Sequence, residues 1–143
     1  MIGGRVLVAG TARGPVLVLT DAVSFWGGFD PGTGCITDRS HPDCGVCLRD
    51  SVVVMPGARG SAGTPGALAE AIRAGTAPRA LVITKADINI VAGAMVADTL
   101  YDLTCPVVVV AEHDADRLRR WTTVTVSADG TIRPDATAGS PVS

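Results

Sequence analysis

Residues 51–66 read Ser-Val-Val-Val-Met-Pro-Gly-Ala-Arg-Gly-Ser-Ala-Gly-Thr-Pro-Gly, an apolar run followed at once by a glycine-rich segment. An uninterrupted run such as Ser51–Met55 is typical of a strand that is buried on both faces of a sheet. Thr64 can cap a helix N-terminus with Pro65 in the first helical position, and Ala67–Ala74 has helical composition. The segment therefore predicts a strand, a glycine loop and a helix in that order.

The same alternation continues downstream. The sequence predicts a strand over Ala80–Thr84, a helix over Ile90–Leu103 and a second buried strand over Val107–Ala111. Strands that alternate with helices along the chain favour a parallel sheet, because each helix connects two neighbouring strands. The central part of the chain is therefore expected to be α/β.

Shorter strands are predicted at both ends of the chain. Arg5–Ala9 and Pro15–Thr20 are apolar runs separated by a glycine-containing turn, which is typical of a hairpin. Trp121–Ser127 and Thr131–Arg133 flank Asp-Gly and predict a second hairpin. Residues 134–143 are mostly small and polar and are expected to form a frayed tail, so the predicted domain spans residues 1–133.

Composition indicates one compact domain and gives no sign of a nucleic-acid or membrane partner. The chain has 143 residues, 47% of them hydrophobic, and 12 basic side chains against 14 acidic ones. A net charge of −2 gives no electrostatic footprint for nucleic acid or an anionic membrane surface. No apolar run approaches the ~20 residues that span a bilayer, and the N-terminal segment does not resemble a secretory signal. We therefore expect a cytoplasmic location, with neither nucleic acid nor membrane as a partner.

The cysteines are expected to be reduced thiols, because the chain is rich in core residues and shows no secretory signal. Cys44 and Cys47 have the spacing of half a tetrahedral zinc site, but no second pair is present. The only other thiols and imidazoles that could complete such a site are Cys35, Cys105, His41 and His113. We therefore expect no metal site in this chain.

The glycine loop is the best candidate for chemistry. Glycines at four positions from 57 to 66 allow a ligand to approach the backbone, and Arg59 and Ser61 are the functional side chains before the helix. A carboxylate or phosphate could bind at the helix N-terminus with Arg59 as a donor and Ser61 beside it. The alternative is a tight strand-to-helix connection whose serine satisfies backbone groups. The glycine spacing fits neither an ATP-binding nor a dinucleotide-binding loop.

Four further residues carry functional hypotheses. Phe25 and Trp26 lie among glycines, where they could stack on a ligand, seal an interface or fill the core beneath the loop. His41 could carry a phosphoryl group or act as a base, or it could be a turn residue. Asp87 follows a buried strand at the end where α/β sheets bind ligands, although a solvated charge explains it equally well.

Five motifs, in this order and spacing, resemble the swivelling-domain small subunit of aconitase X. They are Ser24-Phe-Trp-Gly-Gly-Phe-Asp-Pro-Gly-Thr-Gly34, Asp38-Arg-Ser-His-Pro42, Val54-Met-Pro-Gly-Ala-Arg-Gly-Ser61, Glu70-Ala-Ile-Arg-Ala-Gly-Thr-Ala-Pro78 and Cys105-Pro-Val. The resemblance covers roughly Arg5 to Glu112. It implies a three-layer β/β/α swivelling fold with a central parallel sheet, an antiparallel second sheet and a few helices.

The resemblance also implies a function. Aconitase X proteins are similar to hydro-lyases that remove water from a hydroxy acid, and for this chain cis-3-hydroxy-L-proline is favoured over mevalonate 5-phosphate. In two-chain versions this domain is the small subunit, while cysteines of the larger partner bind an iron–sulfur cluster. The family's proton acceptor is the serine directly after Arg-Gly, which corresponds to Ser61, with Arg59 stabilising the anion. The chain is expected to be inactive without its large subunit.

We expect a set of residues in these motifs to contact the substrate or the partner chain: Ser24, Phe25, Trp26, Gly27, Gly28, Asp30, His41, Gly60, Ala62, Gly63, Thr64 and Asp87. Two departures from the family pattern affect this set. The family's Pro-Ser-Gly-Arg-Gly-Ser-Ser-Ser-Gly-Ser is here Pro56-Gly-Ala-Arg-Gly-Ser-Ala-Gly-Thr-Pro65, with fewer hydroxyl groups, and Lys85 stands where an acidic residue is expected. The competing hypotheses are a non-catalytic swivelling or binding subunit and a phosphohistidine-type carrier that uses His41.

Overall fold

The structure is a computed structural model that describes residues 1–57 and 62–135. Its helices are α1 (Thr64–Ala74), α2 (Ile88–Tyr101) and α3 (Glu112–Leu118). Its strands are β1 (Ile2–Gly3), β2 (Arg5–Val8), β3 (Ala12–Val18), β4 (Phe29–Asp30), β5 (Cys35–Ile36), β6 (Val52–Met55), β7 (Ala80–Ile83), β8 (Val107–Val109), β9 (Thr123–Val126) and β10 (Thr131–Pro134).

Eight strands form one continuous hydrogen-bonded sheet in the order β1-β10-β9-β3-β6-β7-β8-β2. Strands β3, β6, β7 and β8 are mutually parallel, and the other pairings in this sheet are antiparallel. Strand β3 joins the two parts, because residues 12–15 pair with β9 and residues 16–18 pair with β6. The small strands β4 and β5 form a separate antiparallel pair.

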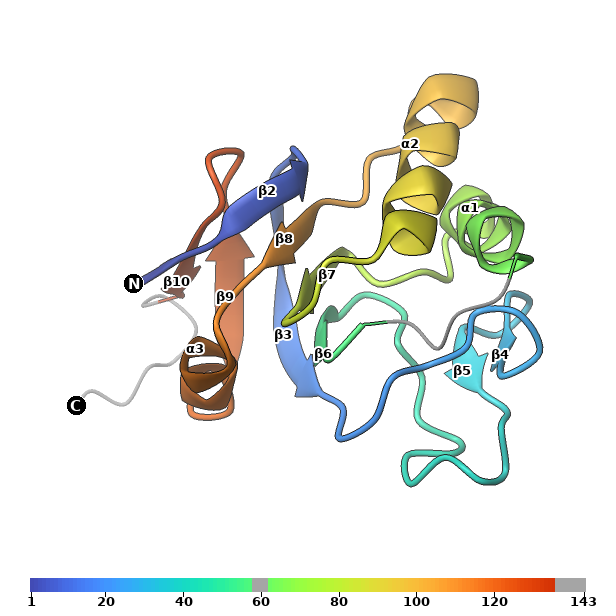
Figure 1. Cartoon of the computed structure of the whole chain (residues 1–143), viewed down its shortest axis with the longest axis horizontal. Coiled ribbons are helices and arrows are strands. Elements are labelled where there is room, and N and C mark those ends of the chain that lie inside the picture. Colours follow the sequence, from blue (N-terminus) through green and yellow to red (C-terminus); the bar gives the residue numbers. More distant parts are fainter. Residues whose placement is uncertain (58–61, 136–143) are drawn as a thin grey trace.

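Three layers follow from the way the central strands are buried. Along β6, Val53 and Met55 pack in the same core as Leu68 of α1, whereas Val52 and Val54 pack in a second core with residues of β9 and β10. Successive side chains of a strand point to opposite faces, so a strand buried on both faces separates two cores. Figure 1 shows β9 and β10 on the left, the parallel strands in the centre, and α1 and α2 together on the right. This arrangement confirms the three-layer fold.

The prediction of an N-terminal hairpin is wrong. Strand β2 pairs with β8 at the edge of the sheet and not with β3. Both edges of β3 are occupied, by β6 and β9, so no edge is left for β2. Short apolar runs show that a strand forms, but they do not show which strand it pairs with. The C-terminal hairpin is confirmed, since β9 and β10 are antiparallel and Gly130 turns between them with a φ of +89°.

The expectation of four reduced cysteines is also wrong. Cys35 and Cys47 form a disulfide, while Cys44 is exposed and free and Cys105 is buried and free. Two hydrogen bonds flank the disulfide pair, from Ile36 N to Val46 O (2.9 Å) and from Leu48 N to Gly34 O (2.8 Å). The two cysteines therefore face each other as a non-hydrogen-bonded pair, the position at which cross-strand side chains are closest.

The buried Cys105 thiol predicts a loss of stability at alkaline pH. Burial raises its pKa from 9.0 to about 12, so above pH 9 the unfolded chain releases this proton while the folded chain retains it. The free energy of unfolding should therefore be unaffected by this group below pH 9 and be lower by about 1.4 kcal/mol at about pH 10. Urea denaturation at about pH 8 and about pH 10 measures this difference.

Cys105→Ala is the matched variant, because it removes the titrating group and leaves every other ionisable side chain in place. Its free energy of unfolding should change less between the two pH values than that of the wild type. An equal decline in both proteins would assign the alkaline instability to other groups.

Candidate active site

The predicted glycine loop runs from the end of β6 to the start of α1, on the edge of the sheet where the parallel strands end. Gly57 has a φ of +154°, a backbone conformation that favours glycine, and Gly63 is the N-cap residue of α1. Thr64 is the first residue of the helix and not its cap. Arg59, Gly60 and Ser61 lie outside the described residues, and Ala62 is the first described residue after them.

The side chain of Trp26 lies directly against the start of α1. A Cβ atom added to Gly63 would lie 2.6 Å from Cδ2 and 2.7 Å from Cγ of Trp26, far inside van der Waals contact. Gly63 is therefore required for the close approach of the indole ring. Trp26 is nevertheless 63% exposed, so it presents an open aromatic surface beside the N-cap of α1.

The turn that presents Trp26 is held by its own polar groups. The Ser24 hydroxyl donates to the carbonyl oxygen of Trp26 (2.6 Å), and the Gly28 amide donates to the carbonyl oxygen of Ser24 (3.1 Å). Gly27 has a φ of +87°, which side-chain-bearing residues rarely adopt. Ser24, Gly27 and Gly28 thus shape the turn.

Phe25 has a different role from its neighbour Trp26. It is 1% exposed and packs edge-on against Phe29, with the ring centroids 5.2 Å apart. Of the alternatives considered for the two rings, Phe25 fills the core beneath the loop, while Trp26 lies on the surface.

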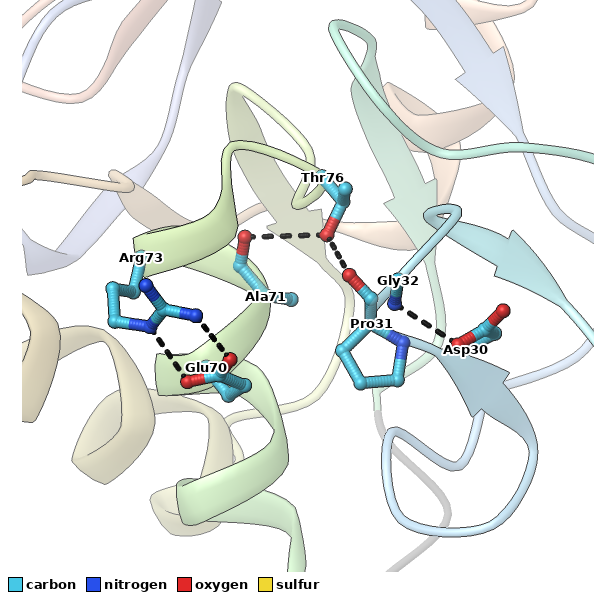
Figure 2. Close-up of polar contacts among 7 residues, drawn as sticks. All are labelled: Asp30, Pro31, Gly32, Glu70, Ala71, Arg73 and Thr76. Atoms are coloured by element: carbon cyan, nitrogen blue, oxygen red, sulfur yellow. Dashed lines mark hydrogen bonds and ion pairs between the residues drawn. The ribbon is translucent and has the colours of Figure 1, made fainter.

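Asp30 stabilises the turn between β4 and β5. Its Oδ1 accepts from the Gly32 amide (2.9 Å), and its Oδ2 accepts from the Thr33 hydroxyl (3.1 Å). Figure 2 shows the next link, in which the Thr76 hydroxyl lies 2.7 Å from the Pro31 carbonyl oxygen and 3.3 Å from that of Ala71. The β4–β5 turn is therefore attached to the C-terminal end of α1.

The charged pair in the same view belongs to α1 alone. Arg73 donates two hydrogen bonds to the Glu70 carboxylate, at 2.8 and 2.6 Å, and these bonds hold the pKa of Glu70 below its ordinary value (Figure 2). Both side chains are exposed, so this motif contributes to the helix surface and not to the candidate site.

Thr76→Val is expected to loosen the attachment of the β4–β5 turn. The variant keeps the shape of the side chain but leaves the Pro31 carbonyl without this donor, which should lower the free energy of unfolding by roughly 1–2 kcal/mol. Urea denaturation measures the loss, and Thr99→Val, on the exposed face of α2, should change stability by less than about 0.5 kcal/mol. Equal stability of wild type and Thr76→Val would contradict a structural role for this hydroxyl.

His41 is a structural residue in this geometry. It is 5% exposed, its Nδ1 accepts from the Asp43 amide (2.9 Å), and its Nε2 donates to the Asp21 carbonyl oxygen (3.1 Å). A phosphohistidine carrier needs an accessible ring nitrogen, and here both nitrogens are engaged inside the turn. The arrangement therefore favours the turn-residue interpretation.

Asp87 caps a helix next to a cavity. Its Oδ1 accepts from the Asn89 amide (2.9 Å) and the Ile90 amide (3.2 Å), which explains why α2 begins two residues before the predicted start. A cavity of about 230 Å³ lies beside it and is lined by Ala22, Pro56, Gly57, Lys85, Ala86 and Asp87. The cavity thus adjoins the beginning of the glycine loop.

Thr64 places an unusual polar atom at the other end of that loop. The residue is completely buried, and its Oγ1 has no hydrogen-bond partner among the described residues. A buried hydroxyl without a partner is costly, so it is uncommon in a purely structural position. The sequence indicates Thr64 as a candidate contact residue, but it does not indicate that its hydroxyl is buried without a partner among the described residues.

The cysteines of the described chain do not fit an iron–sulfur cluster, which requires several thiolates. Cys47 is bonded to Cys35, which also removes it from the hypothetical zinc half-site with Cys44, and burial keeps the Cys105 thiol protonated. Within residues 1–57 and 62–135, no three His, Cys, Asp or Glu side chains are grouped so that they could hold a metal ion. In the same ranges, no helix is both long and apolar enough to span a bilayer.

Comparisons with known proteins identify the family. The sequence model of the aconitase X swivel domain matches residues 1–133. The chain is 36% identical over 115 residues to cis-3-hydroxy-L-proline dehydratase of Hypocrea jecorina, an alignment that covers 80% of this chain and 19% of that protein. It is 33% identical over 138 residues to the phosphomevalonate dehydratase small subunit of Methanocella arvoryzae, covering 96% of this chain and 95% of that subunit.

The chain thus spans about a fifth of the length of the first of these relatives. Its fold is similar to that of aconitase X from Thermococcus kodakaraensis in the holo-form, with a TM-score of 0.78, 30% identity, and coverage of 92% of this chain and 94% of that one. Sequence and structure agree along nearly the whole described chain, which belongs to the aconitase X swivel domain family.

Proposed function

We propose that this chain is the small subunit of a two-chain aconitase X-type hydro-lyase that dehydrates a small hydroxy acid in the cytoplasm. The observation that carries the proposal is that the sequence between β6 and α1 contains Arg59-Gly60-Ser61 in a chain of this family, and that the exposed Trp26 packs against Gly63, the N-cap residue of α1. Similarity along 95% of a separate phosphomevalonate dehydratase small subunit supports a two-chain arrangement.

In this proposal Ser61 accepts a proton from a substrate carbon, and a hydroxyl group leaves as water. A serine hydroxyl is a weak base unless its anion is stabilised. Arg59 supplies a positive charge, and Ser61 precedes the N-cap Gly63 by two residues, where the amides at the start of α1 carry partial positive charge. We assign the iron–sulfur cluster to the large subunit, because the described cysteines do not fit one.

The substrate that we favour is cis-3-hydroxy-L-proline, with mevalonate 5-phosphate second. A phosphate monoester is usually held by several cationic or amide donors. Of the residues that line the cavity beside Gly57, only Lys85 carries a positive charge. One lysine together with Arg59 is suited to a substrate whose only anionic group is a carboxylate.

Co-expression with a candidate large subunit tests this function. The purified complex, assayed anaerobically with both substrates, should dehydrate cis-3-hydroxy-L-proline, while the isolated chain should be inactive. Activity of the isolated chain would contradict the proposed division of the site. Conversion of neither substrate by the intact complex would exclude both proposed substrates.

A non-catalytic swivelling or binding subunit is the alternative, favoured by Ala62 and Gly63 at positions where the family has serines. The same assay separates the two functions. A large subunit that turns over equally well without this chain would establish the non-catalytic role.

A further inference from the structure

We propose that the Cys35–Cys47 disulfide is a thiol–disulfide exchange site whose state sets the position of Trp26 against the start of α1. Cys35 is half-buried and Cys47 is exposed, so the disulfide is within reach of a small thiol from solvent. Disulfide exchange and the displacement of Trp26 do not depend on the proposed function. Only an effect of that displacement on the dehydration reaction would rest on the proposed function.

The disulfide is connected to Trp26 through the β4–β5 pair. Cys35 is in β5 and pairs with Asp30 of β4, which begins directly after the Trp26 turn. Strands β4 and β5 have two residues each and pair with one another, and β5 also forms an isolated antiparallel bridge from Cys35 to Cys47. Such a short hairpin is not stable without further support. The disulfide, together with the backbone hydrogen bonds from Ile36 N to Val46 O and from Leu48 N to Gly34 O, attaches it to the segment at Cys47.

The opposite end of the hairpin is held independently. The Thr76 hydroxyl binds the Pro31 carbonyl at the β4–β5 turn, as Figure 2 shows. Opening the disulfide leaves the side of the hairpin near Cys47 without a covalent link, held by backbone hydrogen bonds, and should therefore loosen it while the turn remains on α1. The expected result is a local displacement of β4 and Trp26 and not unfolding of the domain.

The exchange needs a dithiol as reductant. One of its thiolates attacks Sγ of Cys35 or Cys47, the S–S bond breaks, and the displaced cysteine leaves as a thiolate that takes up a proton. The second thiol of the reductant then attacks the mixed disulfide, its S–S bond breaks, and the remaining cysteine leaves as a thiolate that takes up a proton. Two electrons and two protons pass to the protein, and the reductant becomes a disulfide. An oxidised dithiol reverses the reaction by the same steps.

In the proposed cytoplasmic location, the disulfide would meet reducing thiols. Structural disulfides rarely persist in a reducing cytoplasm, and those that form there are usually transient or redox-sensing. Cys105 cannot take part, because burial raises its pKa to about 12 and its thiol has no access to solvent. The exposed Cys44 lies outside the bond and provides a control.

The amide resonance of Gly63 in a ¹⁵N-labelled full-length chain reports the Trp26 contact, because the indole ring shifts nearby protons. We expect dithiothreitol to move this resonance at least half of the way from its position in the oxidised wild type toward its position in Trp26→Ala. An oxidised dithiol should restore it. Alkylation after denaturation should detect two free cysteines before reduction and all four after it.

Two variants make the test specific. Cys44→Ser should respond to dithiothreitol like the wild type, and the Cys35→Ser/Cys47→Ser double variant should resemble the reduced protein and not respond. An unmoved Gly63 resonance with the disulfide fully reduced would overturn the proposal, as would the absence of the disulfide from protein treated with an oxidised dithiol. If the double variant does not fold, the titration of the wild type still decides. None of these measurements uses enzyme activity, so failure here leaves the proposed function standing.

Discussion

Replacing Ser61 with alanine is expected to lower the dehydration rate of the complex with its large subunit by roughly 10²–10⁴-fold, the contribution typical of a positioned general base. The substitution removes one hydroxyl group from the glycine loop and adds no volume. Substrate affinity should change much less than kcat, because the base acts in the proton-transfer step. Steady-state kinetics of the complex under anaerobic conditions measure both quantities.

The matched control for this substitution is Ser127→Ala, which changes a serine in the turn between β9 and β10, away from the loop. Circular dichroism and co-purification should show that both variants fold and bind the large subunit. Turnover at the wild-type rate by the Ser61→Ala complex would remove this residue from the mechanism and favour the non-catalytic subunit.

Replacing Gly63 with alanine is expected to displace Trp26. The φ of −82° and ψ of −11° at Gly63 are accessible to alanine, so the backbone itself does not oppose the change. The new Cβ atom would instead lie 2.6 Å from the indole ring. We expect the free energy of unfolding to fall by about 1–3 kcal/mol, the usual cost of overpacking. Under the proposed function the dehydration rate should also fall, because Trp26 moves relative to the start of α1.

A double-mutant cycle with Trp26→Ala identifies the cause. Without the indole, Gly63→Ala should retain only the cost of alanine at an N-cap, roughly 0.5–1 kcal/mol. The coupling between the two sites should therefore be large enough to resolve by urea denaturation. An equal loss of stability in both backgrounds would show that the ring does not restrict this position.

The elements that could be predicted from the sequence are those encoded locally. The strands β6, β7 and β8 and the two helices between them follow from short-range hydrophobic patterns, and each was located to within a few residues. The start of α2 was missed by two residues, because the side chain of Asp87 caps the helix and extends it. The sequence therefore indicates that Asp87 lies just after a strand, but it does not indicate that the Asp87 side chain caps α2.

Features that depend on distant partners were not predictable in the same way. The pairing of β2 with β8 joins segments about a hundred residues apart, and the bond between Cys35 and Cys47 depends on a bridge formed by an irregular segment. The contact of Trp26 with Gly63 was likewise invisible, since a glycine can be required for a turn, a ligand or a neighbouring ring. The sequence identified both residues as candidates but could not connect them.

The shared strand β3 has a consequence for how the domain can move. Its first residues are hydrogen-bonded to β9 and its last residues to β6, so bending the molecule between its two β-layers would break backbone bonds inside one continuous strand. Any swing of the domain toward a second chain must therefore be a rigid-body rotation of the whole β-framework. The hinge for such a rotation has to lie outside that framework.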